Sequence, residues 1–211
     1  FIPPLYNYFI MAVTKVDIAA RALIMIGANP ISSFTDDSTE GLVTNNIYEE
    51  IVESSLTRTR WRFASGQKQL SLLTASPAGR FEYAYQIPTN PEVLEISTVT
   101  CNDVVLPYSR YEDMIYLNGY GSSSTVIMDY IFRQDESKFP PYFRLALIYK
   151  LASIYAGAVA RDAGMIKQFD DLAERQFMIA KNIASQETTT KKLPTSRFIE
   201  ERRSSGTGLH G

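Results

Sequence analysis

The feature that most constrains the fold of this chain is a nearly uninterrupted apolar segment, residues 145–160. Thirteen of its sixteen residues are apolar, and they lie on all sides of the helix that they would form. A helix that is apolar all round must be covered by several neighbours. The segment is also shorter than the roughly 20 residues that a bilayer-spanning helix needs. We therefore expect it to form the central helix of a packed core, and we expect no membrane association.

Helical patterns lie on both sides of this segment. Thr14 can cap a helix whose apolar residues recur every three to four positions, and Gly27 can end that helix. A second helix is predicted to end around Trp61. The apolar segment belongs to a third helix, over 142–163, and a fourth helix is predicted after a break at Gly164.

The middle of the chain has the alternating pattern of β-strands. Residues 81–87 and 126–132 place aromatic and aliphatic side chains at every second position. Weaker strand patterns lie at 94–100, 104–106 and 114–117, with turn residues between them. A spacing of about ten residues between such strands indicates an antiparallel meander or a small barrel.

Together these patterns predict an α+β fold. We expect a four-helix bundle with an antiparallel β-rich domain inserted between the second and third helices, followed by an extended C-terminal arm. The start of the chain before Met11 is interpreted as upstream read-through or a cloning remnant. The predicted divisions are an N-terminal extension (1–13), helices 1 and 2 (14–65), the β-domain (66–134), helices 3 and 4 (135–187) and the arm (188–211).

Charge and rare residues exclude several classes of function. The formal net charge is −2, so the chain as a whole is no cationic nucleic-acid binder. The single cysteine, Cys101, excludes an internal disulfide, and the single histidine, His210, excludes a multi-histidine metal centre. We expect no cofactor, no metal and no catalytic residue. Residues 185–211 carry a net charge of +2 and the rest of the chain −4, so a positive arm follows a negative body.

Some polar motifs permit more than one interpretation. Residues 119–124 could cradle a phosphate, but no Lys-Ser/Thr pair or helix follows, so a hairpin loop is the better interpretation. Arg58, Arg60 and Arg62 could bind phosphates or a neighbouring subunit, or mark an exposed helix end. We favour a helix end or a subunit contact. Asp129 and Arg133 are expected to form a surface pair on one strand face.

Four further segments follow one another in a recognisable order. They are the run Ala-Leu-Ile-Met-Ile-Gly-Ala-Asn-Pro-Ile-Ser-Ser-Phe at 22–34, Trp-Arg-Phe-Ala at 61–64, Tyr-Ala-Tyr-Gln-Ile-Pro at 83–88, and the start of the third helix at 140–152. In this order and spacing the chain resembles the tail tubular protein A family, the head–tail adaptors of short-tailed bacteriophages. The resemblance covers roughly residues 13–184.

The resemblance implies a structural virion protein and not an enzyme. Its partners would be further copies of itself in a dodecameric ring, the portal protein above and the tail nozzle protein below. Genomic DNA would pass through the ring without sequence-specific binding, and a net-negative body suits a channel that does not hold phosphates. The protein would be assembled in the host cytoplasm and reside in the virion tail, at the head–tail interface.

Two sets of contact residues are expected. The arm would bind the portal through two apolar anchors and a charged rim, namely Phe198, Ile199, Arg202 and Arg203. Contacts with neighbouring subunits or with the nozzle would be made by Arg58, Arg62, Gly119 and Tyr120.

Two other functions are left open. One is a cell-wall-degrading hydrolase carried by the tail, which would need two carboxylates converging about 5–9.5 Å apart. The adjacent pairs Asp36-Asp37, Asp170-Asp171 and Glu200-Glu201 are instead typical of solvated surfaces. The other is an adaptor of the long-tailed phage connector type, which is helical in its core. The strand patterns at 81–87 and 126–132 argue against it.

Overall fold

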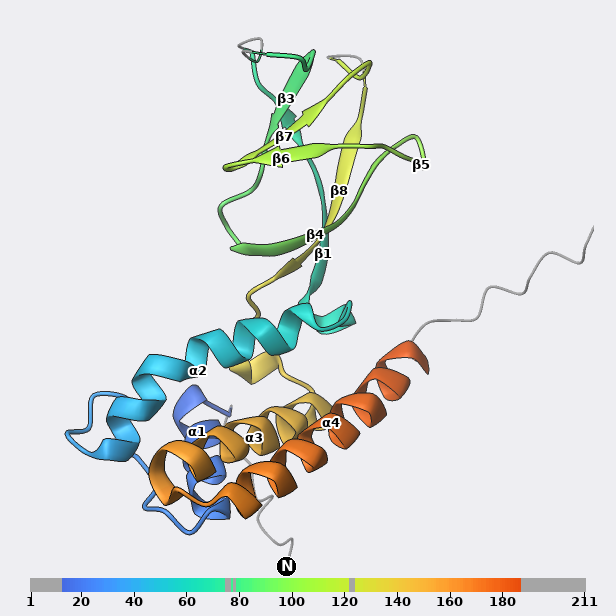
Figure 1. Ribbon diagram of the computed structural model, residues 1–211. Helices are drawn as coiled ribbons and strands as arrows, with labels where there is room; N and C mark the ends of the chain where they lie inside the picture. Colours follow the sequence, from blue (N-terminus) through green and yellow to red (C-terminus); the bar gives the residue numbers. More distant parts are fainter. Residues whose placement is uncertain (1–12, 75–76, 78, 122–123, 187–211) are drawn as a thin grey trace, which may run out of the picture.

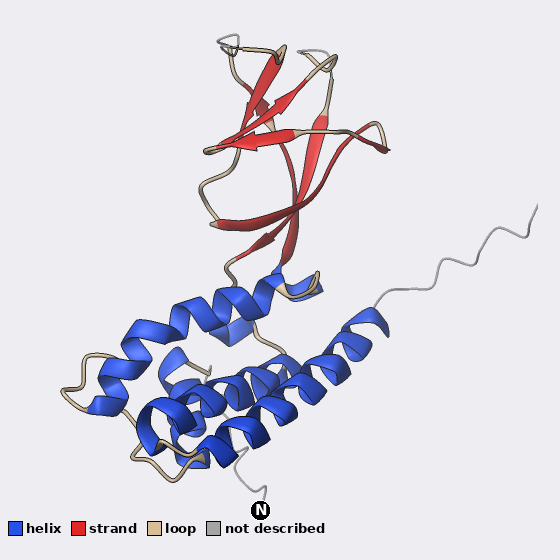
Figure 2. Ribbon diagram, viewed as in Figure 1, coloured by secondary structure: helices blue, strands red, loops and turns tan. Residues whose placement is uncertain are grey.

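The structure is a computed structural model that describes residues 13–74, 77, 79–121 and 124–186. Four α-helices lie at one end of the molecule and two antiparallel sheets at the other (Figures 1 and 2). The α-helices are α1 (Lys15–Met25), α2 (Thr39–Thr57), α3 (Pro141–Tyr155) and α4 (Ala163–Gln186). The short helical segments are the 3-10 helices η1 (Arg62–Ala64) and η2 (Glu136–Lys138), and the π-helical turn η3 (Ala156–Ala160) that continues α3.

Each sheet has four strands, and all neighbouring strands are antiparallel. The first sheet has the order β1 (Ser65–Gln69), β8 (Val126–Phe132), β4 (Val93–Cys101) and β5 (Val104–Val105). The second has the order β2 (Ser71–Leu72), β3 (Tyr83–Gln86), β7 (Met114–Leu117) and β6 (Ser109–Tyr111). Side chains of both sheets form one apolar core, in which Tyr85 and Ile115 of the second sheet are clustered with Val99 and Met128 of the first.

The predicted four-helix bundle with an inserted β-domain is wrong. The structure is a mixed α/β molecule with four helices and two four-stranded sheets, whose strands all fall in the middle of the chain. The helices do not surround a common axis: α1, α2 and α4 each pack against α3, and α2 also contacts strands β4 and β8. The reason is the composition of α3, which needs cover on every side and therefore takes the central position.

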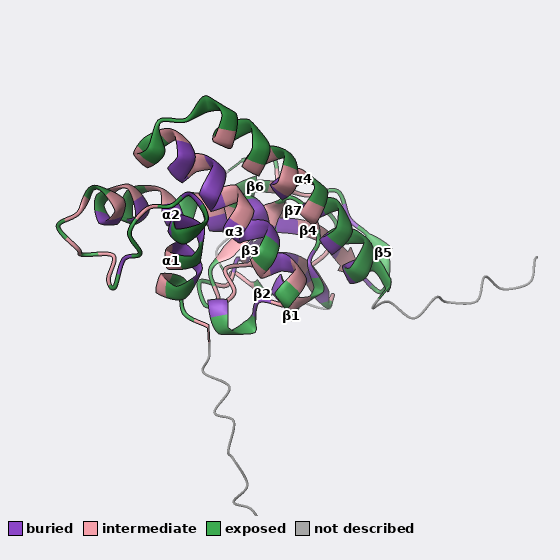
Figure 3. Cartoon of the chain, turned by 90° about the horizontal axis from the view of Figure 1, so that it is seen from below, coloured by how far each residue is buried: buried purple, intermediate pink, exposed green. Residues whose placement is uncertain are grey.

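The central role of the apolar segment is confirmed. Phe143, Leu147 and Leu151 of α3 are fully buried, and Figure 3 shows this helix behind the exposed outer sides of its neighbours. The exclusion of a membrane span by length does not hold, however. With the π-helical turn it spans Pro141–Ala160, 20 residues with mean hydropathy 1.3, and half of that stretch is buried in the protein. By length and composition it could cross a membrane, but core helices meet the same criteria, so this is weak support for a span.

Local signals explain where several elements begin and end. Thr14 caps α1 as predicted, and Asp17 completes a capping box with it. Gly27 has the left-handed φ of +76° expected after that helix. The break between α3 and α4 lies before Gly164 and not at it. There Arg161 adopts the left-handed conformation, and the carboxylate of Asp162 accepts hydrogen bonds from the first turn of α4.

Other boundaries differ from the prediction. Helix α2 ends at Thr57, before Trp61, and the third helix becomes π-helical at Ala156. Strands β1 and β6 were not predicted at all. A meander is wrong too, because β8 pairs with β1 and β4, and β3 pairs with β7, so that strands distant in sequence are neighbours.

A partly buried ionic network joins the end of the first sheet to the helices. Arg133, whose side chain is 16% exposed, follows β8 and donates hydrogen bonds to Glu49 of α2 and Glu136 of η2. The hydroxyl of Tyr48 donates to Glu136 at 3.2 Å. Burial alone would lower the pKa of Arg133, but the two carboxylates outweigh it and raise that pKa. The predicted surface pair of Asp129 and Arg133 is therefore wrong, since Arg133 is committed to this network.

Candidate interaction cleft between the helices and the first sheet

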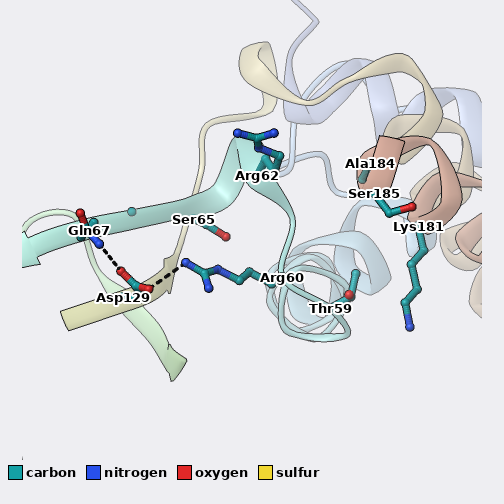
Figure 4. Close-up of a pocket in the computed structure, with 10 residues that line it drawn as sticks. Thr59, Arg60, Arg62, Ser65, Gln67, Asp129, Lys181, Ala184 and Ser185 are labelled. Carbon is teal, nitrogen blue, oxygen red and sulfur yellow. Dashed lines mark hydrogen bonds and ion pairs between the residues drawn. The ribbon is translucent and has the colours of Figure 1, made fainter. Parts of the chain in front are cut away.

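An open cleft of about 630 Å³ lies where the helices meet the first sheet (Figure 4). One wall comes from the connection after α2 and from strands β1 and β8, and the other from the last turns of α4. We call it the junction cleft. Its lining residues are Thr59, Arg60, Arg62, Ser65, Gly66, Gln67, Asp129, Lys181, Ala184 and Ser185.

The turn after α2 sends neighbouring side chains in different directions. Trp61 points inward, with only 1% of its surface exposed; its indole nitrogen donates to the Ser55 carbonyl at 2.9 Å. Its ring packs edge-on against Phe143 of α3, with 5.2 Å between centroids. Because Trp61 anchors the turn in the core, Arg60 and Arg62 on either side of it are left exposed, where they line the cleft.

Arg58 holds α4 beside the cleft. Its guanidinium forms an ion pair with Glu174 at 2.5 Å and lies over the ring of Phe177, 4.4 Å from the centroid. Both partners belong to α4. A cation over an aromatic ring adds about 0.5–1 kcal/mol at an exposed site. The first predicted contact residue therefore contacts its own chain and fixes the position of the second wall.

On the sheet side, one carboxylate is held by two donors. Arg60 pairs with Asp129 at 3.0 Å, and the side-chain amide of Gln67 donates to the other oxygen of Asp129 at 2.8 Å (Figure 4). The side chain of Asp129 is 17% exposed and that of Arg60 is 54% exposed. The arginine head thus remains open to solvent while its charge is directed into the cleft.

The cleft has an excess of positive charge. Arg60, Arg62 and Lys181 contribute three cations, and Asp129 is the one acidic residue among the lining residues. Guanidinium groups bind carboxylates and phosphates through paired hydrogen bonds, and lysine adds a mobile point charge. The arrangement can therefore bind an anionic group, and its open form suits a segment of another macromolecule better than an enclosed small molecule. Over the described residues, no three His, Cys, Asp or Glu side chains form a group that could hold a metal ion.

Exposed apolar side chains lie on the same part of α4. Met178 is 60% exposed, and it shares a helix face with Glu174 and Lys181, which are four residues before and three residues after it. Ile179 and Ile183 are also exposed. Exposed aliphatic side chains beside a charged cleft are typical of protein–protein contact surfaces.

The predicted contact residues do not form one site. Arg62 lines the junction cleft and Arg58 pairs with Glu174 of α4, whereas Gly119 and Tyr120 lie in the β7–β8 loop at the far end of the sheets (Figure 1). There the Gly119 amide donates to the Glu82 carboxylate at 2.8 Å. The Tyr120 carbonyl accepts from the Tyr85 hydroxyl at 2.7 Å. The loop is thus bound to β3 and its surroundings.

The predicted portal-contact residues Phe198, Ile199, Arg202 and Arg203 lie outside the described residues. Helix α4 is described up to Gln186, and Ser185 lines the cleft, so the chain that leads to them starts at the rim of the cleft.

Arg60 and Arg62 are the two of the ten lining residues that the sequence marked as contact candidates; the other eight were not placed beside them. Asp129, Gln67 and Lys181 come from β8, β1 and α4, and only the tertiary packing brings them together. The alternation in 126–132 places Asp129 on the outer face of its strand, which was the one available signal. Gln67 lies in a polar strand with no apolar alternation, and Lys181 has no distinctive neighbours in sequence.

Comparison with known proteins adds no assignment: no family model matches the chain, and no curated protein is found to be similar to it.

Proposed function

We propose that this chain is a structural virion protein, a head–tail adaptor that forms a ring between the portal and the tail nozzle of a short-tailed bacteriophage. The observation that carries the proposal is the ordered set of four segments, at 22–34, 61–64, 83–88 and 140–152, that resembles the tail tubular protein A family. In this proposal the ring lines the channel through which the genomic DNA passes.

The positions of these segments support the resemblance. Residues of the first, second and fourth segments, including Leu23, Trp61 and Phe143, belong to one buried cluster around α3. The third segment contains β3, which lies inside the second sheet. Segments that build shared cores are more informative than scattered matches, because a core depends on all of its members together.

The shape of the molecule suits an adaptor. Helices occupy one end and sheets the other (Figure 2), so the two ends offer surfaces of different chemistry to different partners. The junction cleft lies between the two ends, and the helical end carries exposed aliphatic side chains such as Met178 and Leu42. The two sheets also favour this proposal over a connector with an all-helical core.

The test is assembly with the portal and nozzle proteins encoded by the same genome. We expect the purified chain to bind portal rings, to form a ring of about twelve copies in electron micrographs, and to recruit the nozzle protein afterwards. Portal rings of an unrelated phage serve as the control. A chain that never binds its portal would contradict the proposal. Hydrolysis of purified peptidoglycan that a single carboxylate substitution abolishes would favour the hydrolase instead.

A further inference from the structure

We propose that the junction cleft of one copy receives the acidic side of helix α2 of a second copy, so that copies associate head to tail through opposite charge. The inference deepens the proposed ring by naming the two surfaces that meet between neighbours, and it rests on the proposed function for its biological role.

The acidic side of α2 is built from Glu49, Glu50 and Glu53, together with Glu92 just before β4. We call these four residues the acidic face. Glu49, Glu50 and Glu53 lie within about one turn of α2, and the Glu92 carbonyl accepts a hydrogen bond at 3.1 Å from the amide of Arg133, whose side chain holds Glu49. Burial raises the pKa of Glu53, and repulsion from Glu49, Glu92 and Glu50 raises it further. The cation that opposes them is Arg133, which already pairs with Glu49 and with Glu136 of its own chain, so Glu50, Glu53 and Glu92 are the carboxylates left for a partner.

The acidic face and the cleft lie on different sides of α2. Glu53 and Arg58 are five residues apart, which corresponds to about 140° around a helix axis. Arg58 faces α4, where the cleft begins, so Glu53 faces away from it. Figure 1 shows α2 lying between the sheets and the other helices, which separates the two surfaces within one molecule. They can therefore meet only between copies. Contacts of this heterologous kind close a ring when the rotation per copy allows it.

The two surfaces match in charge and in layout. Glu50 and Glu53 are three residues apart on one face of α2, beside Glu49, whose carboxylate is held by Arg133. The cleft presents the exposed Lys181 and the solvent-open head of Arg60, which also pairs with Asp129, to such carboxylates. Guanidinium and carboxylate groups form paired, charge-assisted hydrogen bonds.

Each surface also carries an exposed apolar side chain beside its charges. Leu42 is 61% exposed and lies seven residues before Glu49, on the same face of α2. Met178, which is 60% exposed, lies three residues before Lys181 on α4. An apolar contact within a charged surround is the usual composition of a protein interface.

Other occupants of the cleft fit less well. The segment that follows α4 starts at the rim of the cleft, but residues 187–211 carry a net charge of +2 and would be repelled by its cations. Duplex DNA would need a far larger cationic surface, because nucleic-acid affinity grows with the number of neutralised phosphates.

The experiment exchanges charges between the two surfaces. Lys181→Glu reverses a cleft residue and Glu50→Lys reverses a residue of the acidic face; both side chains are exposed. Self-association of the full chain is measured by analytical ultracentrifugation at low and high salt, without portal. We expect the unaltered chain to self-associate at protein concentrations up to about 100 µM, and to do so less strongly at high salt. Each single variant should associate at least about tenfold more weakly, because a like charge then opposes its partner.

Mixing provides the decisive readout. In a mixture, the altered cleft of the Lys181→Glu variant meets the altered acidic face of the Glu50→Lys variant, and the two unaltered surfaces meet each other. Opposite charges then face each other at both contacts, so equal amounts of the two variants should associate nearly as well as the unaltered chain. The chain carrying both reversals should also recover. Lys167→Glu and Asp171→Lys, two exposed positions on α4, are matched controls and should change association less than about twofold.

Three outcomes would overturn the inference. They are a chain that stays monomeric at all concentrations, single variants that associate normally, and weakened variants that mixing does not rescue. Binding of a DNA duplex that Lys181→Glu abolishes, with self-association unchanged, would assign the cleft to nucleic acid instead. Portal binding is measured separately. If mixing restores self-association but the chain does not bind portal rings, only the proposed adaptor role is contradicted. If the chain binds portal rings but mixing does not restore self-association, only the proposed contact between copies is contradicted.

Discussion

The residues around Trp61 show how one anchored side chain creates a surface. Its indole is buried against Phe143, and this fixes the backbone of the turn after α2. Arg58 and Arg60, three and one residues earlier, therefore reach different elements, α4 and β8. The three arginines of this turn do not share one face, as an extended chain would have required. Their divergence gives the junction cleft its two walls.

A single carboxylate at the start of α1 gives a prediction that depends on pH. Asp17 accepts hydrogen bonds from the backbone amide and the hydroxyl of Thr14, both at 2.8 Å, and these bonds lower its pKa below 3.8. Because the pKa of Asp17 is lower in the folded than in the unfolded chain, its ionised carboxylate stabilises the fold at pH values above the unfolded pKa. This contribution is lost as the pH falls through the folded pKa.

We therefore expect Asp17→Asn to lower the free energy of unfolding at pH 7 by about 0.5 kcal/mol, a modest value because the site is exposed and screened by solvent. Urea denaturation of both proteins at pH 7 and pH 3 measures this. The difference should be smaller at pH 3 than at pH 7, because part of the stabilising charge is then lost. An equal difference at both values would show that the charge of Asp17 does not contribute.

At the scale of elements, the sequence predicts best where one side of an element is buried. Strands β4, β7 and β8 were placed within one or two residues, because their apolar side chains alternate. Strand β1, with the sequence Ser-Gly-Gln-Lys-Gln, has no such alternation. It forms a strand because it pairs with β8 along its whole length. Its own residues therefore do not predict it.

The arrangement of helices could not be predicted for a related reason. The apolar surface of α3 indicated several neighbours but not their directions, and a bundle was the simplest arrangement. The structure divides the contacts of α2 between α3 and the strands β4 and β8. The same applies to the cleft: Arg60 and Arg62 were found in the sequence, but Lys181 is brought near only by the packing of α4 on α3.

The close pairing of β1 with β8 gives a prediction for the first sheet. Gly66 lies opposite Tyr130, and a Cβ atom added at Gly66 would lie 2.9 Å from the Tyr130 ring. Tyr130 is buried, so the ring cannot move away freely. We expect Gly66→Ala to lower the free energy of unfolding by about 1–3 kcal/mol, the usual cost of overpacking. Thermal unfolding measures it, and Lys68→Ala, an exposed position of the same strand, should have little effect.

The same substitution in a chain that lacks the Tyr130 ring tests whether the ring causes the loss of stability. In a Tyr130→Ala chain the ring is absent, so adding the methyl group at Gly66 should cost much less than in the unaltered chain. Equal costs in both backgrounds would mean that backbone conformation, and not the ring, requires glycine at this position.

At the scale of the whole molecule, two cores are joined through a small, partly buried polar region. The helical core and the core between the sheets are separate clusters, and the network of Arg133, Glu49, Glu136 and Tyr48 lies where β8 returns to the helices. Removing Arg133 would leave the buried carboxylate of Glu136 without its cation. The network therefore sets how the sheet end is held relative to the helical end, which the proposed adaptor would present to different partners.

The division of charge between body and C-terminal segment leads to the last prediction. Residues 187–211 carry a net charge of +2, whereas the chain before them carries −4. If this segment binds the portal, as the sequence predicts, deleting it should abolish co-sedimentation with portal rings. The truncated chain should keep the circular dichroism spectrum and thermal unfolding of the full chain, because both described cores are built from residues before 187.

A finer variant separates the contributions within the segment. Replacing Phe198 and Ile199 together by alanine removes the two apolar anchors, and replacing Thr188 and Thr189 by alanine is the matched control. We expect the first pair to weaken portal binding by at least about tenfold, since buried anchors dominate interface energies, and the second to leave it unchanged. A truncated chain that still binds the portal would move the contact to the helical end, where the exposed side chains of α4 would be the next surface to alter.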